Sequence, residues 1–288
     1  MKIGDEMLEQ EQWTKVIGPR SGWFDVHLSD LWHFRDLIGL FVKRDFVAFY
    51  QQTILGPLWF LLQPLFTTIV FTIIFGRIAR IPTDGLPRML FYMAGIVTWN
   101  YFADCLNKTS DTFVSNASIF GKVFFPRLTV PVSIVITNLI TFAIQFVLFL
   151  AFWAFFYLKG SDIRMTPWVL LTPALLLQMA ALGLGLGILI SSMTTKYRDL
   201  RFVVGFGVQL WMYATPVVYP MSSIPEKWQW LFALNPMAAI IETVRYAFLG
   251  AGALRPFHLA LSLGMTVVIL LAGIITFSRM EKTFMDTV

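Results

Sequence analysis

Charged residues divide this chain into long apolar stretches. Intervals without Asp, Glu, Lys or Arg run from Asp45 to Arg77, from Arg127 to Lys159, from Arg164 to Lys196, from Arg201 to Glu226 and from Arg255 to Arg279. Each interval exceeds the roughly 20 apolar residues that a helix needs to cross ~30 Å of hydrocarbon. The pattern therefore predicts a membrane-spanning helix in every one of these intervals.

A sixth span is expected between Met89 and Ser110. Its charge-free part ends at Ala103 and is too short, so the span must also include Asp104 and Lys108. These two residues are four positions apart and can pair on one face of a helix. Such pairing lowers the cost of placing charge close to a membrane face.

The apolar segment from Trp228 to Phe248 is interrupted by Pro236. Proline lacks the backbone donor of a helix and disfavours helical backbone at the preceding residue, here Asn235. We therefore expect two outer re-entrant half-helices between the fifth and sixth spans, where protein or water covers the broken backbone. The alternative is a kinked seventh span, which would place the two termini on opposite sides of the membrane.

A different pattern precedes the first span, in residues 29–52. Apolar side chains share one face of a helical wheel, and charged side chains lie on the other face. The apolar set is Phe34, Leu37, Ile38 and Phe41, and the charged set is Arg35, Asp36 and Lys43. This is typical of an amphipathic helix in the plane of the lipid headgroups, and the alternative is an ordinary soluble amphipathic helix. Residues 1–28 form a polar N-terminal tail without the apolar region of a signal peptide.

Composition supports one membrane domain over residues 53–288. Hydrophobic residues make up 57% of the chain and charged residues 14%, against about 25% charged residues in soluble domains. The fold class expected is an all-α integral membrane protein with six transmembrane helices. The net charge of +5 comes largely from basic residues between apolar runs, where cytoplasmic loops and lipid headgroups account for it, so we expect no nucleic-acid partner. A weak excess of Lys and Arg places both termini in the cytoplasm.

Motifs for chemistry are missing from the sequence. A phosphate-binding loop needs G-x-x-x-x-G-K-[ST], but Gly121-Lys122 is followed by Val123 and preceded by Asn116 where the first glycine should stand. The three histidines and the single Cys105 are scattered, so no metal site is expected. We therefore expect no enzyme and no cofactor on this chain.

The sequence fits two other classes of membrane protein less well. An integral-membrane glycosyltransferase would need acidic or nucleotide-sugar motifs in a long loop, which this chain does not have. An ion-coupled carrier would need carboxylates inside its spans, and Asp104 and Glu242 are the only candidates near the membrane.

Two turns on the expected cytoplasmic side combine basic and aromatic residues. They are Gly121 to Arg127, between spans two and three, and Lys196 to Arg201, between spans four and five. Such side chains can anchor in a groove of a partner protein. The alternative is that these turns only follow the excess of positive charge on the cytoplasmic side.

Aromatic and amide side chains in or near the spans are candidates for lining a channel. The apolar faces of sugar rings can lie on aromatic rings, and amides can bond hydroxyls. The candidates are Trp59, Phe60, Gln63, Trp99, Tyr101, Gln209, Tyr213 and Tyr219. The alternatives are an aromatic belt at the membrane interface and hydrogen bonds between helices.

Several short motifs follow one another in order along the chain. They are Lys43-Arg44-Asp45-Phe46, Tyr50-Gln51-Gln52-Thr53-Ile54-Leu55-Gly56-Pro57-Leu58-Trp59, Gln63-Pro64-Leu65, Lys122-Val123-Phe124-Phe125-Pro126-Arg127, Tyr197-Arg198-Asp199 and Asn235-Pro236. The stretch from Gln52 to Trp59 is the most specific. From about Leu31 to its C-terminus, the chain resembles permease subunits of type-2 ABC polysaccharide exporters, which serve O-antigen, capsule and teichoic-acid export.

The resemblance implies a homodimer in a bacterial inner membrane, with each copy docked to a separate ATPase subunit that binds ATP and Mg. The cargo would be a polysaccharide attached to a lipid pyrophosphate. Related type-2 ABC permeases move drugs or small lipids, which is the main alternative. Lipid-linked glycan would enter between the interfacial helix and the first span, and ATP hydrolysis would shift span one against span five of the other copy.

The resemblance also implies roles for individual residues. Lys122 to Arg127 and Lys196 to Arg201 would each form a coupling helix that contacts the ATPase. The ATPase-coupling residues would be Lys122, Phe125, Pro126, Arg127, Tyr197, Arg198 and Asp199. The cytoplasmic mouth would be formed by Arg44, Gln52, Leu55, Gly56 and Pro57, and the re-entrant region by Asn235, Pro236, Glu242 and Arg245.

Overall fold

The computed structural model describes residues 28–51, 53–123, 125–194, 199–252 and 254–287, and every regular element in these ranges is helical. The elements of the first half are α1 (Leu28–His33), α2 (Arg35–Gln51), the 3-10 helix η1 (Gly56–Leu58), α3 (Trp59–Phe71), the π-helical turns η2 (Thr72–Ile78), α4 (Arg88–Ser110), α5 (Thr112–Ser115), α6 (Ala117–Phe120) and α7 (Thr129–Leu158). Those of the second half are η3 (Pro167–Leu171), α8 (Thr172–Thr194), α9 (Leu200–Tyr213), η4 (Met221–Ser223), α10 (Glu226–Ala233), α11 (Pro236–Leu249) and α12 (Pro256–Thr287).

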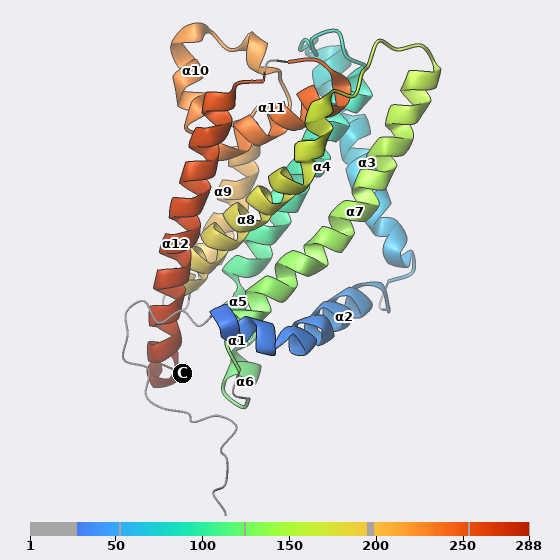
Figure 1. Cartoon of the computed structure of the whole chain (residues 1–288). Helices are drawn as coiled ribbons and strands as arrows, with labels where there is room; N and C mark the ends of the chain where they lie inside the picture. Colours follow the sequence, from blue (N-terminus) through green and yellow to red (C-terminus); the bar gives the residue numbers. More distant parts are fainter. Residues whose placement is uncertain (1–27, 52, 124, 195–198, 253, 288) are drawn as a thin grey trace, which may run out of the picture.

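Four described helical segments are long and apolar enough to cross a membrane. They are Gly56–Ile78, Thr129–Leu158, Pro167–Thr194 and Pro256–Met280. They confirm four of the five intervals predicted from the charge pattern. The long helices form a bundle (Figure 1), and we name its two ends by the short helices there: the α2 end, with α1, α2, α5 and α6, and the α10 end, with α10 and α11.

The interval from Arg201 to Glu226 was predicted to be one full span, and this prediction is wrong in its length. Helix α9 has 14 residues and ends at Tyr213, which makes it about 21 Å long. The rest of the interval is a turn, in which residues 215–218 are buried. Pro216 and Pro220 explain the early end of α9, because proline cannot donate to a helical hydrogen bond.

Helix α4 corresponds to the weakest of the predicted spans, and most of its residues are buried. It contains 23 residues, about 34 Å, and residues 90–99 are all buried. Neighbouring helices α3, α7, α8, α9 and α11 all contact it. Its length suffices for a span, but its polar residues make it less apolar than the four segments named above.

Glycines allow α8 to pack closely on both sides. A Cβ atom on Gly183 would lie 2.7 Å from Cys105 Cβ on α4, and one on Gly187 would collide with Thr109 of the same helix. Gly185 faces the other way, where a Cβ atom would lie 2.8 Å from the Leu270 Cα atom on α12. Small residues let membrane helices approach until their backbones touch, and here they join α4, α8 and α12 into one unit.

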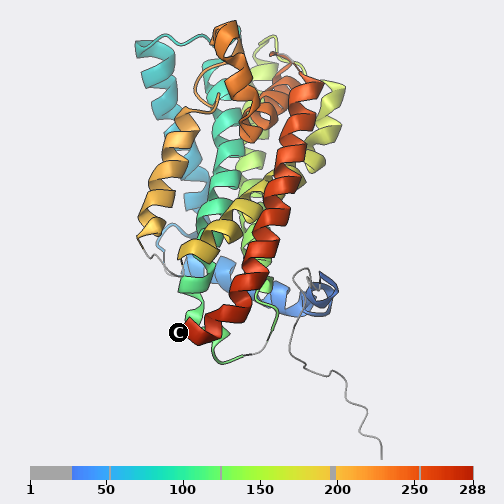
Figure 2. The same cartoon turned by 90° about the vertical axis from the view of Figure 1, so that its left-hand side faces the viewer.

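The predicted break at Pro236 is present, with a clear local cause. Asn235 caps α11 by accepting a hydrogen bond from the Met237 N–H at 3.1 Å, and Pro236 occupies the first helical position, where its missing N–H costs nothing. Both α10 and α11 lie at the α10 end, and α12 then runs to the opposite end (Figure 2). This arrangement contradicts the alternative of a kinked seventh span.

Helix α2 lies across the α2 end of the bundle (Figure 1) and its apolar face packs inward. Phe41 is buried and joins Phe113, Phe120 and Phe125 in a second hydrophobic cluster, against which Phe34 and Leu37 also pack. The apolar side of the predicted amphipathic helix therefore packs against other helices of the chain. Residues 1–27 of the N-terminal tail lie outside the described residues.

Candidate functional site

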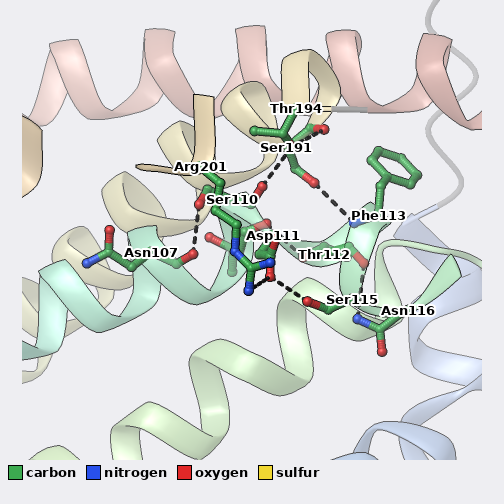
Figure 3. Close-up of polar contacts among 11 residues, drawn as sticks. Asn107, Ser110, Asp111, Thr112, Phe113, Ser115, Asn116, Ser191, Thr194 and Arg201 are labelled. Atoms are coloured by element: carbon green, nitrogen blue, oxygen red, sulfur yellow. Dashed lines mark hydrogen bonds and ion pairs between the residues drawn. The ribbon is translucent and has the colours of Figure 1, made fainter. Parts of the chain in front are cut away.

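A cluster of polar side chains lies at the α2 end where α4 and α5 meet α8 and α9 (Figure 3). Its centre is Asp111, which separates α4 from α5. Asp111 Oδ2 accepts a hydrogen bond from Ser115 Oγ at 2.5 Å and pairs with Arg201 Nη2 of α9 at 2.8 Å. The Asp111 side chain is only 13% exposed, whereas that of Arg201 is 58% exposed. We call this group the Asp111 cluster.

Helix α8 joins the Asp111 cluster through its last two turns. The Thr194 hydroxyl donates to the Ser110 carbonyl at 3.1 Å, and the Phe113 N–H donates to Ser191 Oγ at 3.3 Å. Directly after α5, Asn116 Nδ2 donates to the Thr112 carbonyl at 3.0 Å. These bonds satisfy backbone groups that are left open where α4 ends and α5 begins, and they tie both helices to α8.

The first turn predicted to bind the ATPase differs from expectation in two ways. Described residues 121–123 and 125–128 form turns, so Lys122 to Arg127 is not a coupling helix; the short helices α5 and α6 come just before it. Pro126 accounts for this, because it disfavours helical backbone at Phe125. Phe125, Pro126 and Arg127 are buried, with the Arg127 guanidinium 5.7 Å from the centroid of the Phe120 ring. Lys122 is exposed and is the accessible charge of this turn.

The second predicted turn is described only at its end. Tyr197 and Arg198 lie outside the described residues. Asp199 is exposed and stands directly before α9, where its carbonyl accepts from the Phe202 N–H at 3.0 Å. Arg201, two residues further on, pairs with Asp111, so an ion pair links the second predicted docking turn to the junction of α4 and α5.

The predicted mouth lies between α2 and α3, and Gln52 falls outside the described residues. Leu55 is exposed, and Gly56 has a φ of 51°, a conformation that glycine adopts without strain. Gly56 and Pro57 begin the η1 turn that leads into α3. Arg44 pairs with Asp45 at 2.8 Å, with its guanidinium 4.7 Å from the Phe41 ring centroid.

The predicted channel-lining residues divide into an exposed group and a buried group. Trp59 and Gln63 of α3 and Gln209 and Tyr213 of α9 are exposed. Phe60 is half-buried and stacks on Phe46 of α2. In the folded chain, α3 and α9 lie on either side of α4 (Figure 1), so the exposed group flanks that helix.

The remaining channel candidates, Trp99, Tyr101 and Tyr219, contact other residues of the same chain. Trp99 is buried against Trp211, and Tyr101 is buried against Phe142 of α7. Tyr219 is half-buried and donates to the Tyr213 carbonyl at 3.1 Å. The prediction that Trp99 and Tyr101 face a channel is wrong for the folded chain, because the wheel position of an aromatic residue does not distinguish a pore from a helix contact.

At the α10 end, Arg245 of the predicted re-entrant region is fully enclosed. Its Nη1 donates to the Pro216 carbonyl at 2.6 Å and its Nη2 to the Val217 carbonyl at 2.5 Å. Its guanidinium also lies 3.7 Å from the centroid of the Phe91 ring. Arg245 thus holds the turn after α9 against α11 and α4.

Other residues of the predicted re-entrant region support this packing. Asn235 Nδ2 donates to Thr215 Oγ1 at 2.8 Å, and Trp153 Nε1 of α7 donates to the Phe248 carbonyl at 2.7 Å. Glu242 borders a cavity of about 170 Å³ that Asp84, Arg255 and His258 also line. No group of His, Cys, Asp and Glu suited to a metal ion occurs among the described residues.

Sequence reasoning did not single out Asp111, and it included Arg201 only as the last residue of the second predicted coupling turn. Each stands just outside a long apolar stretch, where a charge reads as a boundary marker. Their opposite charges could have indicated an ion pair, because the ends of spans on one side of a membrane can lie close together.

The profile of the family described as ABC-2 type transporter matches residues 36–249 of this chain. The O-antigen export system permease protein RfbA of Klebsiella pneumoniae is 26% identical over 251 residues, which is 87% of this chain and 94% of that protein. The protein of the same name from Myxococcus xanthus is 28% identical over 226 residues, 77% of this chain and 83% of its own length. The polysialic acid transport protein KpsM of Escherichia coli is 22% identical over 237 residues, 81% of this chain and 89% of its own length. A match over most of the chain identifies this multi-pass membrane protein as a member of the ABC-2 type transporter family.

Proposed function

We propose that this chain is the permease subunit of an ABC exporter that moves a lipid-linked, O-antigen-like polysaccharide across the bacterial inner membrane. The observation that carries the proposal is the similarity to an O-antigen export permease over 94% of that protein's length. The fold supports it, because long apolar helices take up most of the chain and α2 lies across one end of them. In the proposed topology, α3, α4, α7, α8 and α12 cross the membrane, α9 crosses it together with the buried turn that follows, and α10–α11 is re-entrant from the outer side.

A separate ATPase subunit supplies the energy in this proposal. The sequence has no G-x-x-x-x-G-K-[ST] motif, so ATP and Mg would bind the partner. Two copies of the permease would pair with two copies of the ATPase, with both termini of the permease in the cytoplasm. The α2 end would then be cytoplasmic, and α5, α6 and the exposed Lys122 would offer the docking surface.

The Asp111 cluster supports a path for force from the ATPase into the bundle. A push on α5 would act on Asp111, and through its ion pair on Arg201 and α9. Because α9 and α3 both contact α4, a shift of α9 would alter the face of the bundle where Trp59, Gln63 and Gln209 are exposed. This face, joined to that of a second copy, would form the polysaccharide channel.

Loss of surface polysaccharide in a deletion strain, with recovery on return of the gene, tests the proposal. We expect the deletion to leave lipid-linked glycan on the cytoplasmic side, where added glycosidase reaches it only after the cells are opened. Purified chain alone should hydrolyse no ATP, and its addition to the neighbouring ATPase in lipid should stimulate hydrolysis. Normal surface glycan in the deletion strain would overturn the proposal, and loss of a capsule in place of O-antigen would favour the cargo named for the relative KpsM.

A further inference from the structure

Helix α4 changes character halfway along its length. Residues 90–99 are all buried, but from Asn100 onwards one side of the helix is open. The partly or fully exposed positions are Asn100, Ala103, Asp104, Asn107 and Lys108, while Tyr101, Phe102, Cys105 and Leu106 between them are buried. The spacing of three and four residues places the open positions on one helix face, about 12 Å long from first to last.

This face, which we call the α4 polar face, is polar at every position except Ala103. The side chains of Asp104 and Lys108 are 43% and 53% exposed and form a loose ion pair at 4.0 Å. Lys108 Nζ also donates to Asn138 Oδ1 of α7 at 2.7 Å. Asn107 Oδ1 is buried and has no hydrogen-bond partner among the described residues.

The α4 polar face is bounded by neighbours but not covered by them. Lys108 reaches α7 on one side, and Asp111, one turn after Asn107, reaches Arg201 of α9 on the other. Helix α3 also contacts α4, but the ring contact between them joins Phe71 to Tyr92, two turns before the face begins at Asn100. At its opposite end, α3 turns to α2, where Phe60 stacks on Phe46.

Neither lipid nor a second copy is a suitable cover for such a face. Each charge in hydrocarbon costs at least about 2.5 kcal/mol, and amides without partners add to this cost. In a dimer with its twofold axis along the membrane normal, equivalent residues lie at the same depth, so a face placed on the axis would bring Asp104 against Asp104 and Lys108 against Lys108. Like charges brought together away from water repel strongly.

The geometry points to the α4 polar face as a binding surface for the hydroxyl groups of the moving polysaccharide. Two amides, a carboxylate and an ammonium provide donors and acceptors in alternation, which suits uncharged hydroxyls better than an anionic or apolar cargo. The exposed Gln63 of α3 and Gln209 of α9 extend this chemistry on either side of α4. The inference rests on the proposed function and names the wall of the channel that hydrogen-bonds the cargo.

Cysteine labelling in the full permease–ATPase complex tests this inference. Native Cys105 is buried on the closed side of α4, so the wild-type chain should resist a charged, membrane-impermeant methanethiosulfonate applied to inverted vesicles. Ala103→Cys and Asn107→Cys should react roughly tenfold or more faster than Val147→Cys, because the reactive thiolate does not form in hydrocarbon. Val147 is the control because it is 65% exposed on apolar α7, where the surrounding medium would be lipid.

Vesicles from cells that make the lipid-linked polysaccharide, with the ATPase blocked by vanadate, should protect Ala103→Cys and Asn107→Cys relative to vesicles from cells without the glycan. Asn100→Leu should lower export several-fold at unchanged protein level. Absence of reaction at 103 and 107, or reaction that the glycan does not slow, would overturn the inference. Export by the wild-type chain in the same vesicles is scored separately, so failure there counts against the proposed function and not against the α4 polar face alone.

Discussion

Two arginines hold the turns at opposite ends of the bundle, and they do so in different ways. At the α10 end, Arg245 is buried and donates to backbone carbonyls of Pro216 and Val217, with Phe91 against its guanidinium. At the α2 end, Arg201 is 58% exposed and pairs with the carboxylate of Asp111. The first contact joins a side chain to backbone that cannot rotate away, whereas the second joins two side chains, one of them in solvent.

The energies of the two contacts differ accordingly. Breaking the contacts of Arg245 would leave buried carbonyls without donors, at about 1–3 kcal/mol each. An ion pair with an exposed partner contributes about 0–1 kcal/mol in typical cases, and burial of one partner raises this. The contacts at the α10 end are therefore expected to stay intact. The contacts at the α2 end can rearrange at a cost that the binding of a partner protein could offset. This asymmetry agrees with a transporter driven from the α2 end.

Removal of the Arg245 guanidinium should have the largest effect. Arg245→Met keeps much of the side-chain volume but leaves the Pro216 and Val217 carbonyls without a donor, so we expect a loss of about 2–6 kcal/mol in stability. The measurement is the thermal unfolding temperature of the purified chain in detergent, together with its amount in the membrane. Arg255→Met is the matched control, since Arg255 is exposed at the same end and donates to Gln229. Equal effects of the two substitutions would show that the α10 end is not anchored by Arg245.

A methyl group at the α4–α8 contact should have the next largest effect. Gly187→Ala places a Cβ atom against Thr109 where no space exists, so α8 must move away from α4 at a cost of about 1–3 kcal/mol. Gly264→Ala on α12 is the control, because nothing lies within 4 Å of its Cβ position. We expect a lower unfolding temperature for the first variant only. The contact of α4 with α8 connects the two ends rigidly only if the helices cannot move apart, and an unchanged Gly187→Ala variant would contradict such a connection.

Substitutions in the Asp111 cluster should alter coupling more than folding. Arg201→Ala should retain the unfolding temperature within a few degrees, but lower export several-fold for each ATP hydrolysed by the complex. The charge exchange, Asp111→Arg with Arg201→Asp, should recover part of the coupling if the ion pair transmits motion. Measurement of ATP hydrolysis and glycan export in the same vesicles separates coupling from activity. A large drop in stability, or coupling equal to that of the wild-type chain, would assign the pair a different role.

The charge pattern was enough to predict four of the apolar spans, because the cost of a charge in hydrocarbon is large and local. It overestimated α9, since absence of charge does not require helix, and the buried turn from Thr215 to Val218 is kept apolar for packing around Arg245. The Asn235–Pro236 break was predictable because a cap and a proline act on their immediate neighbours.

The side chains of the candidate site were less predictable. Trp99 and Tyr101 were expected in a channel but are buried, and Arg127 was expected at a docking surface but packs near Phe120. Asp111 and Arg201 lie far apart along the sequence, and only the approach of α4 and α9 brings them together. Contacts of this kind depend on how helices are placed in three dimensions, which periodicity along one helix does not determine.

The smallest effect is expected from the exposed charge of the first turn. Lys122 is exposed at the α2 end, so Lys122→Glu should leave the fold intact and weaken binding of the ATPase through a long-range electrostatic term. A single exposed charge contributes about 0.2–1 kcal/mol, which corresponds to at most a several-fold change in Kd. The change should shrink at high salt, where exposed charges are screened. Lys159→Glu is the matched control, because Lys159 follows α7 at the opposite end and is also exposed. If Lys159→Glu weakens ATPase binding as much as Lys122→Glu does, the α2 end has no special part in docking, and the contrast between an anchored end and an adjustable end would lose its functional meaning.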